Sequence, residues 1–271
     1  MIRLSQMEDA VRAEFRNRQF SALQKKRVGL LHVTDMVRQC SREIFYSKMR
    51  VHNITHNYNT ESLSYFFGGE AVHQLLDSAS RKGQGEQPLY YNFVDDKKVE
   101  IFEDHIDFEL TGEAKSWNQS DWLKILVGER DALYRTVIDG EDKDILVDYK
   151  TWVSKGFKKR EPSAEHVEQL NIYKYLSMKM LNQEITHGAV VYLDYQNRIS
   201  DPLIFVKKLD DDVNTRARLL SKYHDILETV DTGDLPDRTQ YWKCTKFCPY
   251  ASRCFTEESI TRHENSLEVV T

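Results

Sequence analysis

The stretch from Val127 to Trp152 constrains the fold more than any other part of the chain. It contains two β-rich runs, and the dipeptide Asp139-Gly140 separates them. Both central residues of a tight hairpin turn need a positive φ, and this dipeptide is favoured in such turns. We therefore predict a β-hairpin that turns at Asp139-Gly140, and a two-residue loop would place Asp131 opposite Asp148.

Side chains alternate along a strand, so this hairpin has two different faces. Asp148 and Lys150 share one face, and Asp131 joins them if the loop has two or four residues. A loop of three or five residues would need a bulge to restore the same arrangement. The opposite face carries the side chains of Ile145, Val147 and Tyr149.

The composition excludes several classes of protein. The chain has 271 residues, a hydrophobic fraction of 40% and a formal net charge of −5. No apolar run approaches the roughly 20 residues that a membrane span needs, and the N-terminus lacks the apolar core of a secretory signal. The charge argues against a protein that coats nucleic acid through bulk basicity, although a local basic groove would escape that count. We expect an intracellular, cytoplasmic protein with no membrane partner.

Hydrophobic periodicity predicts helices and short strands in alternation. Helices are expected at residues 1–25, Val33–Arg50, Ser62–Arg81 and Ala164–Leu181, and a last one from Asp210–Asp212 to just before Gly233. Strands are expected between Tyr90 and Gly112, in the hairpin, and at Gly188–Tyr195 and Leu203–Leu209.

Two carboxylates and a lysine on one face of a hairpin can form a phosphodiesterase site. Asp131 and Asp148 would bind a hard divalent cation such as Mg²⁺ or Mn²⁺, which prefers oxygen ligands. Such a metal lowers the pKa of a bound water and neutralises charge on the scissile phosphate. Lys150 could orient that water or stabilise the pentacoordinate phosphate. Taken alone, an Asp-x-Lys triplet also fits an ordinary solvated strand.

Four short motifs follow one another along the chain. They are Gly69-Glu70-Ala71-Val72-His73, Gly128-Glu129-Arg130-Asp131, Asp148-Tyr149-Lys150-Thr151 and Gln169-Leu170-Asn171-Ile172-Tyr173. In this order they resemble the G-x-x-x-H, G-x-x-D, (D/E)-x-K and Q-x-x-x-Y motifs of the RecB-like branch of the PD-(D/E)XK nuclease superfamily. Arg130 stands where the superfamily name has proline.

The resemblance implies a role for each matched residue. The implied metal ligands are His73, Asp131, Asp148 and the main-chain carbonyl of Tyr149. The implied catalytic set is Lys150, Asp131, Asp148, Gln169 and Tyr173. In this set Lys150 is the catalytic lysine, and Gln169 and Tyr173 position the site and the DNA backbone. Individually, His73 also fits a helix edge, and Gln169 with Tyr173 fits an ordinary amphipathic helix.

The four cysteines give a second signal. Cys40 stands alone near the N-terminus, whereas Cys244, Cys248 and Cys254 form a C-x3-C-x5-C pattern. This layout resembles the CRISPR-associated RecB-like exonucleases of the fourth Cas family, in which two residues, rather than three, often separate the first C-terminal pair. The resemblance implies a 4Fe-4S cluster held by all four thiolates. A zinc site on the same thiolates stays open as an alternative, because zinc accepts the same ligands.

The resemblance implies an α/β fold, with a restriction-endonuclease-like mixed sheet flanked by helices and a helical iron–sulfur subdomain built from both chain ends. Residues 1–256 would form a single RecB-like nuclease domain. Its cluster-binding parts would lie at 28–50 and 238–256, and its nuclease core at 62–209. Residues 257–271 would form a polar tail that could be disordered.

The implied activity is that of a metal-dependent DNA exonuclease on single-stranded ends, with 5′→3′ polarity. It would trim DNA for CRISPR spacer acquisition in antiviral defence, with the spacer integrase as a partner, and a homo-oligomer is compatible with the sequence. Two alternatives stay open. One is a recombination or repair nuclease of a phage or mobile element, and the other is a non-catalytic DNA-end-binding subunit.

Overall fold

The computed structural model describes residues 30–48, 69, 71, 89–99, 102–104, 107–109, 121, 123–152, 161–194, 198–238, 244, 248 and 250–257. Its first elements are β1 (Leu31–His32), α2 (Val33–Met36), α3 (Ser41–Lys48), β2 (Leu89–Asn92), β3 (Lys97–Lys98), β4 (Phe102–Asp104) and β5 (Asp107–Glu109). The remaining elements are β6 (Ile125–Gly128), β7 (Ala132–Ile138), β8 (Glu141–Trp152), α6 (Ala164–Leu181), β9 (His187–Asp194), β10 (Arg198–Lys208) and α7 (Asp212–Thr232). A further short helix covers residues 251–257.

Several expected elements lie outside these described residues. They are the helix at 1–25, almost all of the helix at Ser62–Arg81, and the tail at 258–271. None of the helices in the described part of the chain is long and apolar enough to span a membrane.

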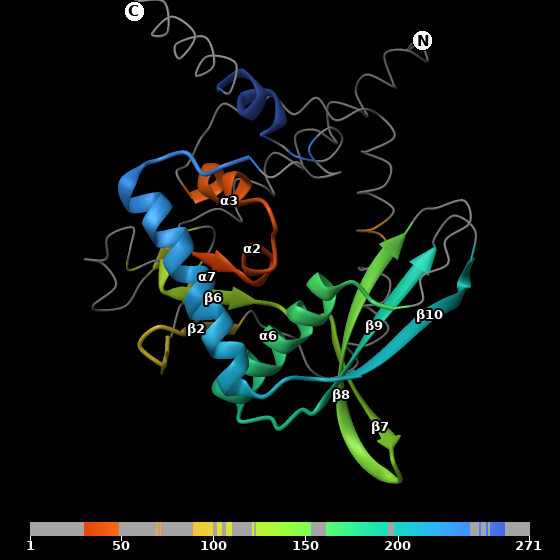
Figure 1. The fold of residues 1–271 in the computed structure, drawn as a ribbon. Helices are drawn as coiled ribbons and strands as arrows, with labels where there is room; N and C mark the ends of the chain where they lie inside the picture. Colours follow the sequence, from red (N-terminus) through yellow and green to blue (C-terminus); the bar gives the residue numbers. More distant parts are fainter. Residues whose placement is uncertain are drawn as a thin grey trace, which may run out of the picture.

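The described strands form two mixed four-stranded sheets and a separate two-stranded pair, with helices packed on them (Figure 1). One sheet has the strand order β1-β6-β2-β3 and the other β10-β9-β8-β7. The predicted α/β class with mixed sheets flanked by helices is confirmed, and it is consistent with a restriction-endonuclease-like fold; the described strands form two such sheets. Glu129, Arg130 and Asp131 are not paired in either described sheet and separate the two. Before them β6 pairs with β1 and β2, and after them β7 pairs with β8.

The hairpin of β7 and β8 has the predicted register. Asp139 and Gly140 have φ values of 55° and 81°, which is the positive-φ pair that a two-residue turn requires. The ladder runs from Ile138 opposite Glu141 to Ala132 opposite Val147. Continued one residue beyond the paired strands, this register sets Asp131 against Asp148, and the two-residue loop is confirmed.

The predicted alternation of faces on β8 is also confirmed. Leu146 belongs to the main core, together with Leu170 and Leu176 of α6. The opposite face forms a separate buried cluster of Ala132, Ile145, Val147, Tyr149, Ala189, Val191 and Leu193. Asp148 and Lys150 share the parity of Leu146, so they lie on the face that α6 covers.

Helix α6 connects β8 to its parallel neighbour β9, as a crossover between parallel strands requires. The Ser163 side chain caps its start by accepting a hydrogen bond from the His166 N–H. Asn182, in the left-handed conformation, ends it. The predicted bounds Ala164–Leu181 are confirmed.

The predicted helix Val33–Arg50 is two helices, α2 and α3, with a break at Val37–Cys40. After this break, α3 runs in a direction that brings Lys48 to Asp35. A continuous helix would hold these two residues more than three turns apart.

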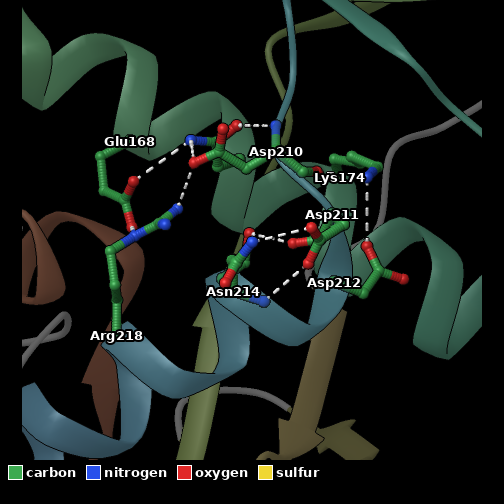
Figure 2. A network of polar contacts seen from close by, with 9 residues as sticks. Glu168, Lys174, Asp210, Asp211, Asp212, Asn214 and Arg218 are labelled. Carbon is green, nitrogen blue, oxygen red and sulfur yellow. Dashed lines mark hydrogen bonds and ion pairs between the residues drawn. The ribbon is translucent and has the colours of Figure 1, made fainter.

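A polar network joins α6 to α7 and to the end of β10, and Figure 2 shows its members. Arg218 of α7 lies 2.8 Å from both Glu168 and Asp210. Lys174 of α6 forms an ion pair with Asp212 at 3.3 Å. Exposed ion pairs each contribute little to the free energy of unfolding. We therefore expect this network mainly to orient α6.

A buried ion pair holds the N-terminal helices together. Lys48 is 2% exposed, and its Nζ lies 2.7 Å from Asp35 Oδ2 and 2.5 Å from the Leu30 carbonyl oxygen. Burial by itself raises the pKa of Asp35, but the attraction of Lys48 and Arg38 outweighs burial and lowers it to about 2. The carboxylate is therefore charged in the folded state across the physiological range.

We predict that Lys48→Met lowers the free energy of unfolding by about 1.5–3 kcal/mol at pH 7, because it removes the closest charged partner of the buried Asp35 carboxylate and leaves Arg38, at 3.3 Å, as its remaining ion-pair partner. The same change at exposed Lys97 should cost no more than about 0.5 kcal/mol. Urea denaturation of both variants measures the difference. An equal effect at the two positions would contradict the role of the pair.

The effect of Lys48→Met should also depend on pH. The pKa of Asp35 is lowered in the folded state, so the stability that the pair provides is present above pH 4 and is lost as the pH falls towards 2. Urea denaturation at pH 7 and at low pH should therefore show that the difference in free energy of unfolding between the variant and the wild type becomes smaller in acid.

Candidate active site

The Asp148 carboxylate is the most unusual group on the α6 side of β8. The residue is 1% exposed. Its Oδ1 lies 2.8 Å from Lys150 Nζ, and its Oδ2 has no hydrogen-bond partner among the described residues. Burial raises the pKa of Asp148 from 3.8 to about 7, against the attraction of Lys150 and with the repulsion of Asp131. A buried carboxylate oxygen without a partner is costly, so this arrangement calls for a cation.

Asp131 is anchored next to Asp148 by the backbone of β8. Its Oδ2 accepts a hydrogen bond of 2.7 Å from the main-chain N–H of Tyr149. Tyr149 lies between Asp148 and Lys150, so this bond fixes the first carboxylate beside the second and beside the lysine. The predicted grouping of Asp131, Asp148 and Lys150 is present.

The donors fit a hard divalent cation. Asp131 and Asp148 offer carboxylate oxygens, and the Asp148 oxygen that lacks a partner would gain one from the metal. Within the described ranges, no group of three or more His, Cys, Asp or Glu side chains could hold a metal ion. At this site only two of the implied side-chain ligands are described, because His73 lies outside the described residues.

Gln169 and Tyr173 lie on α6 and pair with each other. Gln169 Nε2 donates a 3.0 Å hydrogen bond to the Tyr173 hydroxyl, and both residues are buried. Burial raises the pKa of Tyr173, and the negative charges of Asp148 and Asp131 raise it further. The Tyr173 hydroxyl is therefore within electrostatic reach of both carboxylates.

The two motif glycines lie where a side chain would clash. A Cβ on Gly69 would lie 2.9 Å from Thr151 Oγ1, so the first motif approaches β8 directly after the Asp-x-Lys triplet. A Cβ on Gly128 would lie 2.6 Å from Val33 Cγ2 and 3.0 Å from Tyr173 Cε1. Glycine at 128 thus lets α6 approach the strand that leads to Asp131.

Arg130, which stands where the superfamily name has proline, makes structural contacts. It is 9% exposed, and its Nη1 donates to Ser177 Oγ at 3.3 Å and to Gln183 Oε1 at 2.5 Å. These bonds tie the segment between β6 and β7 to the C-terminal part of α6. Sequence reasoning did not assign Arg130 this role, because its partners are 47 and 53 residues away.

The four cysteines gather at one cavity away from this site. Cys40, Cys244, Cys248 and Cys254 all line it, with Arg42 and Arg238 among their neighbours. Next to it, Tyr46 of α3 stacks on Tyr250 with ring centroids 5.3 Å apart. The predicted meeting of the two cysteine-bearing segments is therefore present.

Burial raises the pKa of the Cys248 thiol to about 12, and it raises the pKa of Cys40 as well. The other cysteines nearby add to both shifts. Buried thiolates at this cavity would need a cation to balance them. Among the described residues, however, no group of three or more His, Cys, Asp or Glu side chains is arranged to hold a metal ion, and this includes the four cysteines.

We predict that Gly128→Ala lowers the free energy of unfolding by about 1–3 kcal/mol and also reduces the nuclease activity that the motifs imply, because the new methyl group pushes against Val33 and Tyr173. Gly140→Ala serves as the control. It meets nothing within 4 Å but forces a positive φ on alanine, at a cost of about 1–2 kcal/mol. Urea denaturation and a cleavage assay should show that both variants lose stability while Gly128→Ala alone loses activity.

The comparisons with known proteins agree with the geometry. The family model of the PD-(D/E)XK nuclease superfamily, whose members are metal-dependent nucleases, matches residues 98–255. The matched region contains Asp131, Asp148 and Lys150, and it covers more than half of the chain. No curated protein matches the sequence. The chain belongs to the PD-(D/E)XK nuclease superfamily.

Proposed function

We propose that the chain is a metal-dependent deoxyribonuclease whose phosphodiester hydrolysis depends on Asp131, Asp148 and Lys150. One observation carries this proposal. The buried Asp148 carboxylate has a lysine on one oxygen, no hydrogen-bond partner within the described part of the chain on the other, and a second carboxylate beside it. A purely structural site would not keep a half-satisfied carboxylate in the core.

Asp131 and Asp148 would hold Mg²⁺ or Mn²⁺, together with His73 and the main-chain carbonyl of Tyr149. When bound, the metal supplies a water of lowered pKa and stabilises charge on the phosphate. Lys150 is 22% exposed in its side chain, so its amine can contact both Asp148 and a substrate phosphate. We assign to it the orientation of the attacking water and the stabilisation of the pentacoordinate phosphate.

Tyr173 would contact the substrate backbone. Gln169 Nε2 donates to the Tyr173 oxygen, so the hydroxyl hydrogen is left to donate elsewhere. A phosphate oxygen near the two carboxylates is a suitable acceptor. Gln169 then acts as a positioning residue for Tyr173.

The finer proposal is an exonuclease that acts on single-stranded DNA ends with 5′→3′ polarity. It rests on the order of the four motifs and on the one-plus-three layout of the cysteines. The same resemblance supports trimming of DNA before CRISPR spacer integration, with the integrase as partner. Recombination or repair of phage or mobile-element DNA is the alternative for the same chemistry, and the genes next to this one would separate the two.

We predict that Asp131→Ala, Asp148→Ala and Lys150→Ala each reduce Mg²⁺- or Mn²⁺-dependent cleavage of DNA by roughly 100-fold or more, because each removes a metal ligand or the group that acts on the phosphate. The assay should use single and double strands labelled at the 5′ or the 3′ end, so that it also reports polarity and substrate class.

Two matched controls lie farther along the same hairpin. Asp142 is exposed, and Lys143 pairs with the exposed Glu141 at 3.1 Å. Asp142→Ala and Lys143→Ala should cleave as the wild type does. A folded Lys150→Ala variant with wild-type cleavage would refute the site, and a wild type that binds DNA ends without cleaving them would favour a non-catalytic subunit.

We also propose that the four cysteines bind a 4Fe-4S cluster of structural function. Their shared cavity and the meeting of both chain regions around them support this. The cluster would fix α3 against the helix at 251–257. The thiols would have to move closer together on binding it.

We predict that protein purified without oxygen is brown and contains about four iron atoms per chain. Cys248→Ser should lose the iron and lower the melting temperature, because a thiolate ligand is gone. Elemental analysis and absorption spectra measure the content. Colourless protein that contains one zinc ion and no iron would contradict the cluster and favour a zinc site on the same cysteines.

A further inference from the structure

Strand β10 lies at an edge of the described sheet, and its middle part is exposed. In the order β10-β9-β8-β7 it pairs only with β9 among the described strands (Figure 1). Leu203 is 39% exposed, Ile204 58% and Val206 50%. With the half-buried Phe205 they form an unbroken apolar run of four residues. An edge strand presents main-chain N–H and C=O groups with which another strand can pair.

The run continues the apolar layers of the sheet to its edge. Ile204 and Val206 lie opposite Val191 and Ala189 of β9, which belong to the buried cluster on the face away from α6. On the other face Phe205 packs against the main core. The first of these layers thus ends at β10 in side chains that are half or more exposed. The core of a homodimer has this appearance when its two subunits are taken apart.

The opposite edge strand of the same sheet, β7, does not carry such a run. Arg135 and Thr136 separate Tyr134 from Val137 there, and all four side chains are exposed. Charged and polar side chains on an edge strand discourage pairing with another chain. The two edges of this sheet therefore differ in their fitness for an interface, and β10 is the better one.

The residues around the run on β10 favour a second copy of this chain as its partner. Pro202 precedes the run, and Lys207 and Lys208 follow it. If two β10 strands pair antiparallel with Ile204 opposite Ile204, the apolar residues of each copy lie opposite apolar residues of the other. The lysines of the two copies then lie at opposite ends of the paired segment, whereas a parallel pairing would set them side by side.

We propose that β10 is the interface of a homodimer, in which two copies of the chain pair their β10 strands antiparallel around Ile204 and join their sheets into one. Two-fold symmetry makes such a contact self-complementary, so Leu203 of each copy lies opposite Phe205 of the other. The inference is independent of the proposed nuclease function, because it uses no residue of that site.

Sedimentation velocity over a concentration series should give the mass of two chains for the wild type, with dissociation on dilution. Ile204→Lys sets two lysines opposite each other at the centre of the interface, so it should raise the dissociation constant by about tenfold or more. Val137→Lys is the matched control, because Val137 is 63% exposed on β7, and it should dimerise as the wild type does. Thermal unfolding of each variant checks that it is folded.

A pair of opposite charges tests the register. Ile204→Asp alone should also weaken the dimer by about tenfold or more, because two carboxylates then lie opposite each other. An equal mixture of the Ile204→Lys and Ile204→Asp chains sets a lysine opposite an aspartate, so it should form mixed dimers more tightly than either variant forms its own. Native mass spectrometry distinguishes the mixed dimer by its mass.

A wild type that stays monomeric at every concentration would overturn the inference and leave this edge to a strand of a different protein. An unchanged dimer in Ile204→Lys would place the interface elsewhere on the chain and would also overturn it. Equal weakening by Val137→Lys would contradict the choice of β10. A mixture no more dimeric than its two components would contradict the antiparallel register around Ile204.

Discussion

The burial of Asp148 is the constraint on which the rest of the structure depends. This carboxylate is 1% exposed, with one oxygen bound to Lys150 and the other without a hydrogen-bond partner in the residues that the structure describes, and it is stable only if its surroundings are fixed. Helix α6 covers this face, the Tyr149 N–H holds Asp131 beside it, and the α6–α7 network orients the helix. The site is thus a group of buried polar side chains next to the apolar core.

Local signals predicted much of this arrangement. The turn at Asp139-Gly140 set the hairpin register, and the period of two along β8 then placed Asp148 and Lys150 together. Ser163 and the apolar spacing after it gave the bounds of α6. Each of these signals lies within a few residues of the feature that it predicts, so no knowledge of tertiary structure was needed.

Contacts between distant residues could not be predicted in the same way. Lys48 reaches Asp35 across the break between α2 and α3, and Arg130 reaches Ser177 from the segment that joins the two sheets. The pairing of His166 with Tyr192 joins α6 to a strand 26 residues later.

The central claim is that Asp131 and Asp148 together bind a divalent cation, and calorimetric titration with Mn²⁺ tests it most directly. The wild type should bind Mn²⁺ at pH 8, and about tenfold more weakly at pH 6, because burial raises the pKa of Asp148 to about 7 and a proton then competes with the metal. Asp148→Asn should lose this binding, whereas Asp142→Asn on the exposed part of the hairpin should keep it. Equal Mn²⁺ binding by the wild type and Asp148→Asn would contradict the account.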